Sequence, residues 1–382
     1  MKHRTGIIIL LTVILSVILT VRFYSLEPPA PWGYVNAGAV NPYYGVMRPL
    51  GYRVLMPVVL NLMHIIPTPG DPRIPVPFAV LLCVVFYGFL RAMTFSARLS
   101  LIGVCLLACC GGMIDLLKDF GINNADTSSH ILILLALWAM IKNQDAWFST
   151  ATLLGVFNRE WALVLLPLWY LYHYGWTLSA PSLRRLVRVS LPSLLVYGLV
   201  RYVYFPNTAL GVMGDELGPL LPASETTTFY YYWSAVGTME WRAFYERVVS
   251  MQFYTFGMVG LLPYALAGYR RAPQSWQRAA GYYTLLCVLQ LAITTDVWRL
   301  AFYLFPILIP GYLYWLQDLE AHTASPIFYA IVALTGVGYL VLETSLIGIV
   351  YSGVCLFILS RLHSKPDGQS CRDPECASTV EA

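Results

Sequence analysis

Residues 147–174, WFSTATLLGVFNREWALVLLPLWYLYHY, are apolar almost throughout, and one polar group interrupts them at Asn158-Arg159-Glu160. Without the interruption the stretch would be a single membrane-spanning helix, which needs about 20 apolar residues. Charged side chains are costly in a bilayer, so they usually face a protein interior or a watery cavity. The stretch therefore predicts two short helices that turn at 158–160, where the surrounding protein covers the irregular backbone.

The composition of the whole chain is typical of a membrane protein. Of its 382 residues, 58% are hydrophobic and 12% are charged, whereas a soluble domain is about half apolar and about 25% charged. Tryptophan and tyrosine are abundant, at 11 and 27 residues, as in the aromatic belts at lipid–water interfaces. The expected fold class is an all-α polytopic integral membrane protein.

The positive-inside rule orders the apolar segments. An apolar run at 6–21 follows Lys2, His3 and Arg4, and we interpret it as an uncleaved first span because no small-residue cleavage site follows. The arginines at 91 and 98 and those at 184, 185 and 188 fall on the cytoplasmic side if 147–174 turns back and 50–66 lies flat at the outer interface. The alternative for 50–66 is a complete crossing. The other predicted spans are 74–90, 99–113, 130–141, 189–205, 251–269, 279–295, 297–316, 326–342 and 344–360.

This topology amounts to one transmembrane domain over 1–360, with about twelve transmembrane helices that include the pair of short ones, and an outer interfacial helix. The large outer loops are 24–73 and 206–250, and the polar residues 361–382 form a disordered cytoplasmic tail. Most of the eight cysteines lie in apolar runs as small hydrophobic residues. Neither a disulfide framework nor a metal site is expected from their spacing.

The interruption at 158–160 is the first candidate site. A guanidinium binds phosphate oxygens in pairs, so Arg159 is a candidate phosphate ligand, and Glu160 would hold it in place. Asn158, which directly precedes Arg159, is included among the candidate substrate-binding and phosphate-binding residues. The alternative is a structural break, in which Asn158 caps the second helix and Glu160 satisfies its first amide groups.

A second candidate precedes the apolar run at 130–141. Asp126 stands just before that run and is either a helix cap or a carboxylate that a rigid helix start directs into an outer cavity. His130, which opens the run, is included among the candidate substrate-binding residues.

Two further groups lie beside apolar segments at the outer face. Asp296 and Arg299 are one helical turn apart and form either an interfacial ion pair or a ligand contact. Arg48, Tyr52 and Arg53 precede or open the flat helix, where the arginines either snorkel to the headgroups or hold the phosphate of a lipid carrier.

Three motifs in order carry a resemblance to a known superfamily. They are Tyr52-Arg53-Val-Leu-Met-Pro57, Ala125-Asp126-Thr and Asn158-Arg159-Glu160-Trp-Ala-Leu. With them the chain resembles a bacterial group of the GT-C superfamily, polytopic glycosyltransferases that use polyprenyl-phosphate-linked sugars. The motifs cover residues 1–175, and beyond that the likeness is one of topology.

The resemblance implies transfer of a sugar from an isoprenoid-phosphate carrier to a glycan or lipid acceptor at the extracytoplasmic face of a bacterial cytoplasmic membrane. The family usually has a catalytic acid in the first outer loop, and residues 24–50 contain only Glu27. The expected general base is therefore Glu27 or Asp126, with Glu160 also in the catalytic set. Apart from the lipid-linked donor, no cofactor, metal or nucleic acid is expected. The alternatives are a transporter or flippase of lipid-linked sugars and a non-catalytic protein of envelope assembly.

Overall fold

The computed structural model describes residues 55–62, 75–108, 110, 113, 125–199, 261–292, 302–322, 327 and 331–332. These residues form helices and connecting turns without any strand, which agrees with the all-α prediction. The helices are α3 (Leu55–Leu62), α4 (Pro75–Ala92), α5 (Ala97–Ala108), α7 (Ala125–Ile141), α8 (Asp145–Asn158), the 3₁₀ helix η3 (Glu160–Val164), α9 (Leu165–Tyr174), α10 (Ala180–Gly198), α14 (Leu262–Tyr269), α15 (Gln274–Ala292) and α17 (Phe305–His322).

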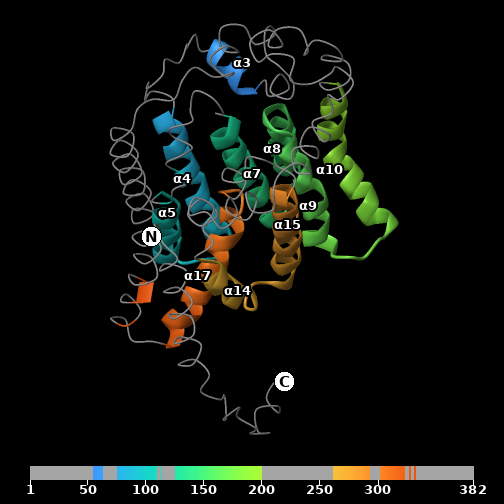
Figure 1. Ribbon diagram of the computed structural model, residues 1–382. Coiled ribbons are helices and arrows are strands. Elements are labelled where there is room, and N and C mark those ends of the chain that lie inside the picture. The colour runs from blue at the N-terminus through green and yellow to red at the C-terminus, as the bar shows by residue number, and fades with distance from the viewer. Residues whose placement is uncertain are drawn as a thin grey trace, which may run out of the picture.

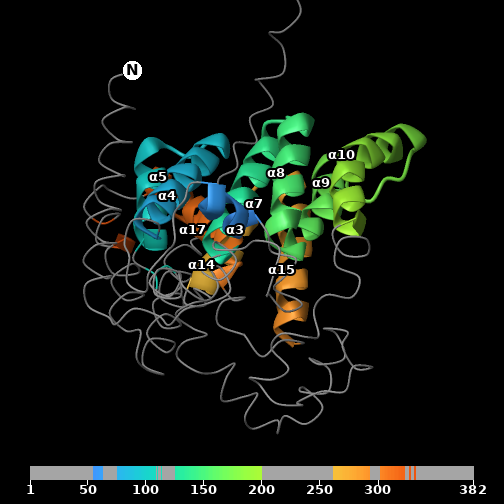
Figure 2. The same ribbon diagram turned by 90° about the horizontal axis from the view of Figure 1, so that it is seen from above.

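The helices form a bundle with a continuous apolar interior (Figure 1). Seen from above, α4 and α5 lie on one side, α9 and α10 on the other, and α7 and α17 between them (Figure 2). The short helix α3 packs against α7 and α8, and Figure 1 shows it above their upper ends. None of the helices within the described ranges combines the length and apolarity needed to cross a membrane.

The predicted interruption of 147–174 is confirmed. Helix α8 ends at Asn158, and Arg159 follows with extended backbone (φ −155°, ψ 140°). Glu160 then begins η3, which leads into α9. Two short helices separated at 158–160 therefore replace one long helix.

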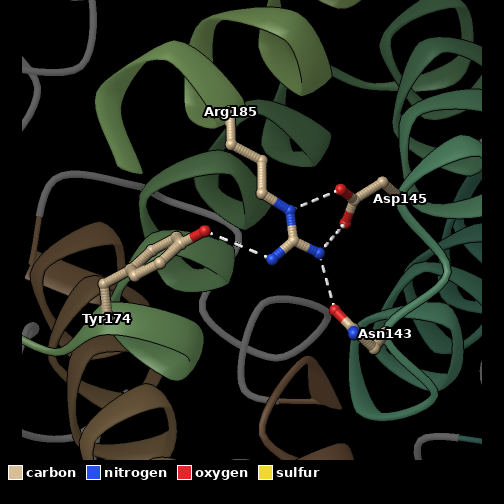
Figure 3. Close-up of polar contacts among 4 residues, drawn as sticks. All are labelled: Asn143, Asp145, Tyr174 and Arg185. Atoms are coloured by element: carbon tan, nitrogen blue, oxygen red, sulfur yellow. Dashed lines mark hydrogen bonds and ion pairs between the residues drawn. The ribbon is translucent and has the colours of Figure 1, made fainter. Parts of the chain in front are cut away.

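Arg185 on α10 contacts both the start of α8 and the end of α9 (Figure 3). Its guanidinium donates to both carboxylate oxygens of Asp145, at 2.6 and 2.9 Å, and to the hydroxyl of Tyr174 at 3.2 Å. It also donates to Asn143 Oδ1 at 2.6 Å and stacks over Trp169 at 5.1 Å. The first residue of α8 and the last of α9 thus share one partner, although α8 alone rises about 21 Å. The chain reverses at the break, as a hairpin.

The end of the bundle that holds this contact also collects the basic connections. The ring of Trp138 lies against Gly88, so α4 and α7 run in the same direction and end together. Arg91 and Lys142, at those two ends, therefore lie at the same end of the bundle as Arg185, and the break lies at the other. The predicted grouping of 91–98 with 184–188 is confirmed, and its assignment to the cytoplasm stays a prediction.

Helix α10 begins nine residues before the predicted span 189–205. Ser179 is its N-cap, and the side chains of Ser179 and Ser182 bond reciprocally to each other's backbone amides in a capping box. Pro181 occupies the first turn, where proline costs no hydrogen bond. Residues 184–188 are thus helical, which corrects the predicted start of this helix at 189. The capping box starts the helix in a polar segment, before the apolar residues from which the span was predicted.

Helices α14 and α17 approach through small residues. A Cβ atom on Gly268 would clash with the backbone of Gly311 and Trp315, and one on Gly311 would lie 2.8 Å from the Cβ of Ala265. Small residues permit such close backbone approach between apolar helices. The predicted spans 326–342 and 344–360, the loop 206–250 and the tail 361–382 lie outside the described residues, apart from 327, 331 and 332.

The contact of Arg185 can be tested by its removal. We expect Arg185→Met to lower the free energy of unfolding by about 1–2 kcal/mol, because several charge-assisted hydrogen bonds are lost at a partly exposed site. The matched control is Arg184→Met, at the exposed neighbouring position. Thermal unfolding in detergent, followed by tryptophan fluorescence, compares the two. Equal melting temperatures would show that the hairpin does not depend on this contact.

The α14–α17 interface gives a second prediction. Gly268→Ala should cost about 1–3 kcal/mol, because the added methyl group overpacks a backbone contact. Gly281→Ala on α15 is the control, since a Cβ there meets no atom within 4 Å. That change should leave stability unchanged or raise it by about 0.5–1 kcal/mol, from helix propensity alone. A Gly268 variant as stable as the Gly281 variant contradicts the proposed close packing.

Candidate functional site

Asn158, the last residue of α8, joins the break to α7. Its side chain is fully buried, and Nδ2 donates to the hydroxyls of Ser128 and Ser129 at 2.8 and 2.6 Å. The N-cap of η3 is Arg159, with no side-chain hydrogen bond to the helix start. The alternative in which Asn158 caps the second helix is therefore wrong. Its amide instead fixes the break beside the first turns of α7.

The turn at the break is tight. The amide of Arg159 donates to the carbonyl of Gly155 at 2.6 Å. Ala162 on η3 lies so close to Gly155 that a Cβ atom on Gly155 would be 2.6 Å from the methyl group of Ala162. Gly155 therefore allows η3 to fold back against α8. This geometry sets the direction in which Arg159 leaves the backbone.

The side chain of Arg159 reaches the residues just before α17. Its Nη1 donates to the hydroxyl of Tyr303 at 3.3 Å, and its Cζ lies 6.0 Å from the centre of that ring. A guanidinium at this distance is attracted to the face of an aromatic ring. Tyr303, at 1% exposure, thus joins the break to a segment 144 residues away in sequence.

Aromatic rings surround the contact between Arg159 and Tyr303. The ring of His130 lies 4.3 Å from Tyr303, 4.9 Å from Phe302 and 5.6 Å from Phe305, between ring centres. Among the described residues, no hydrogen bond reaches either nitrogen of this buried imidazole. Trp161 on η3 packs against Tyr303 at 5.7 Å. Helix α7, the break and the start of α17 therefore converge on Tyr303.

Asp126 lies in the first turn of α7, which begins at Ala125. It is thus inside the helix rather than at its cap. A carboxylate there is favoured by the helix dipole. Ser128 and Ser129, two and three residues further on, bond to Asn158, so the backbone of Asp126 belongs to the end of α7 beside the break. The residues directly before Ala125 lie outside those described, and the role of the carboxylate stays a prediction.

Glu160 begins η3 and is half-buried. Among the described residues, no ion pair joins its carboxylate to the guanidinium of Arg159. The observed contact on Arg159 comes from Tyr303. The predicted role of Glu160 in holding Arg159 therefore has no contact to support it within this part of the chain.

Six predicted site residues lie outside the described residues, and they are Glu27, Arg48, Tyr52, Arg53, Asp296 and Arg299. The elements that follow them do reach the break. Helix α3, which begins two residues after Arg53, packs against α7 and α8. Tyr303, four residues after Arg299, contacts Arg159 directly.

The converging side chains can bind an anion beside an apolar or aromatic group. Arg159 offers a planar set of donors suited to phosphate oxygens, and Trp161 and Tyr303 offer ring surface. Within the described ranges, no group of three or more His, Cys, Asp or Glu side chains could hold a metal ion. The arrangement offers hydrogen-bond donors for a phosphate ester beside aromatic ring surface.

Tyr303 and Trp161 are the residues that sequence reasoning missed. Tyr303 stands in the predicted span 297–316, where an aromatic residue is ordinary. The spacing from Arg299 is one helical turn, which is the signal that could have singled it out. Trp161 directly follows Glu160, within the third motif of the GT-C resemblance.

The fold matches the apo crystal structure of the Archaeoglobus fulgidus oligosaccharyltransferase with a TM-score of 0.51 and 12% sequence identity, over 94% of this chain and 58% of that one. The chain is similar in fold to an oligosaccharyltransferase. The same archaeal protein in complex with Zn and sulfate matches with a TM-score of 0.45 and 14% identity, over 91% and 53% of the two chains.

The chain spans little more than half the length of that archaeal protein. No protein-family model and no curated protein sequence matches it. The likeness agrees with the GT-C resemblance at the level of the fold.

The link between Asn158 and α7 can be tested without touching Arg159. We expect Asn158→Leu to lower the free energy of unfolding by about 1–3 kcal/mol, because two buried serine hydroxyls lose their donor. Thr152→Val on the same helix is the control, since the Thr152 hydroxyl bonds only to the carbonyl of Phe148 within α8. Chemical denaturation of both variants measures the difference. An Asn158 variant no less stable than the Thr152 variant would contradict a structural link.

Proposed function

We propose that this chain is a GT-C-type integral membrane glycosyltransferase. It moves a sugar from a polyprenyl-phosphate carrier to a glycan or lipid acceptor at the extracytoplasmic face of a bacterial cytoplasmic membrane. The observation that carries the proposal is the break at the end of the bundle, where Arg159 leaves an interrupted apolar hairpin and is held against Tyr303. The oligosaccharyltransferase-like fold supports the same class of reaction.

Placement in a membrane is supported by composition and by surface. Only 12% of the residues are charged. Helix α10 and its C-cap residue Leu199 expose large apolar side chains at 42–58% exposure, and those on the helix are Leu183, Val187, Leu191, Leu194 and Leu195. Repeated exposed apolar side chains of this kind suit contact with lipid. The basic end of the bundle then faces the cytoplasm by the positive-inside rule, and the break faces outward.

The proposed reaction is a displacement at the anomeric carbon of the carrier-linked sugar. The acceptor hydroxyl oxygen forms the new glycosidic bond and gives its proton to a carboxylate. The bond between the anomeric carbon and the phosphate oxygen breaks, and the polyprenyl phosphate leaves with the electron pair. Cationic donors stabilise the charge that develops on that leaving group.

The roles of individual residues follow from their places. Arg159 binds the leaving phosphate, together with Arg53 or Arg299 from the segments that lead to α3 and α17. Asp126 is the preferred general base, because its helix start adjoins the break through the serines that bond to Asn158. Glu27 in the first outer loop is the alternative base.

Substitutions at the break test the proposal. We expect Arg159→Gln to lower sugar transfer at least 100-fold, since removing one oxyanion donor commonly costs about 10²–10³ in rate. We expect Glu160→Gln to abolish transfer as well, because this carboxylate belongs to the proposed catalytic set. Purified protein with a panel of polyprenyl-phosphate sugars gives the rates, and Arg188→Gln at the opposite end of the bundle is the control.

The outcomes separate the competing functions. Full activity of the Arg159 and Glu160 variants would remove the break from the mechanism. Movement of the lipid-linked sugar across liposomes without transfer would identify a transporter or flippase. Neither transfer nor movement by the native protein would favour a non-catalytic role in envelope assembly.

A further inference from the structure

We infer that Tyr303 is a positioning residue that fixes the guanidinium of Arg159 for the phosphate of the lipid carrier. The inference rests on the proposed function. It assigns a specific task to a residue that lies outside the three motifs of the GT-C resemblance. The observation behind it is the paired contact of Tyr303 with Arg159, through both its hydroxyl and its ring.

The backbone position of Arg159 makes a restraint on its side chain useful. Its backbone is extended, between the end of α8 and the start of η3, so the residue itself lies outside any helix. An arginine side chain carries about 2 kcal/mol of rotamer entropy that binding a ligand must otherwise overcome. A partner that restricts the guanidinium before the ligand arrives lowers that cost, which is the effect of preorganisation.

Tyr303 is itself fixed, and this makes it an effective restraint. Its side chain is 1% exposed, and the rings of His130 and Trp161 lie 4.3 and 5.7 Å from its own. These rings come from α7 and η3, so two elements hold Tyr303 before it contacts Arg159. A restraint anchored on rigid elements is more precise than one on a loop.

The contact with Tyr303 engages one nitrogen of the guanidinium. The hydroxyl of Tyr303 accepts one hydrogen bond, from Nη1, and a guanidinium has five N–H donors in one plane. One contact at Nη1 and one at the ring restrict the plane of the group, and that plane sets the direction in which a guanidinium donates to a phosphate.

Tyr283 on α15 offers a matched comparison within the same cluster. It is fully buried, and its ring contacts Trp161 at 6.0 Å, close to the distance between Trp161 and Tyr303. Among the described contacts, none joins Tyr283 to Arg159. Removing its hydroxyl therefore changes the same aromatic environment without changing the proposed restraint.

The test measures binding of a sugar-free polyprenyl phosphate to the full-length protein in lipid nanodiscs. Tyr303→Phe keeps the ring and removes the hydroxyl, and we expect it to weaken binding roughly five- to tenfold, as for the net loss of one ordinary intramolecular hydrogen bond. Tyr283→Phe should bind as the native protein does. Melting temperatures of the two variants should agree.

A double-mutant cycle separates positioning from packing. In an Arg159→Gln background, Tyr303→Phe should have no further effect, because no guanidinium remains to be positioned. An equal loss with and without Arg159 would overturn the inference, as would unchanged binding by Tyr303→Phe in a protein that binds the carrier. Absence of binding by the native protein would overturn the proposed function, and the inference with it.

Discussion

Backbone amides at a helix end need hydrogen-bond partners, and in apolar surroundings they cannot find them in water. The break at Arg159 meets this constraint within a few residues. The amide of Arg159 bonds back to Gly155, and the turn closes so tightly that only glycine fits at that position. Asn158 then ties the same turn to α7. Everything at the candidate site depends on this closure, because it determines where the side chain of Arg159 points.

Different interactions hold the two ends of the hairpin. At the break, amide and hydroxyl groups bond to one another and aromatic rings gather around Tyr303. At the other end, Arg185 connects the start of α8, the end of α9 and the turn at Asn143. Its carboxylate partner Asp145 raises the pKa of Arg185 above its usual range, so this connection stays charged at any physiological pH. The two fastenings together hold two helices that are individually too short to be stable alone.

The interruption at 158–160 could be predicted because its signal is local, a charged pair within an apolar run. The start of α10 was missed because hydropathy marks apolar segments and not caps, although the Ser179–Ser182 box was present in the sequence. Asn158 suits a cap by residue type, and its tertiary bonds to α7 decided otherwise. The spacing from Arg299 could have drawn attention to Tyr303, but its contact with Arg159 could not be predicted, since the two residues are 144 positions apart and nothing local identifies which helices meet. Patterns within one helix were thus readable, and contacts between helices were not.

The ion pairs distinguish one end of the bundle from the other. Within the described part of the chain, the ion pairs Arg185–Asp145, Arg271–Asp318 and Arg98–Glu320 all lie at the basic end of the bundle. The first pair joins α10 to α8, and the other two join α17 to α5 and to the residues after α14, so ion pairs hold two separate groups of helices at this end. Near the break, the described contacts between helices are neutral hydrogen bonds, ring contacts and the Arg159–Tyr303 pair. The two ends of the bundle therefore differ in what joins their helices, which is opposite charge at the basic end and mainly aromatic packing at the break.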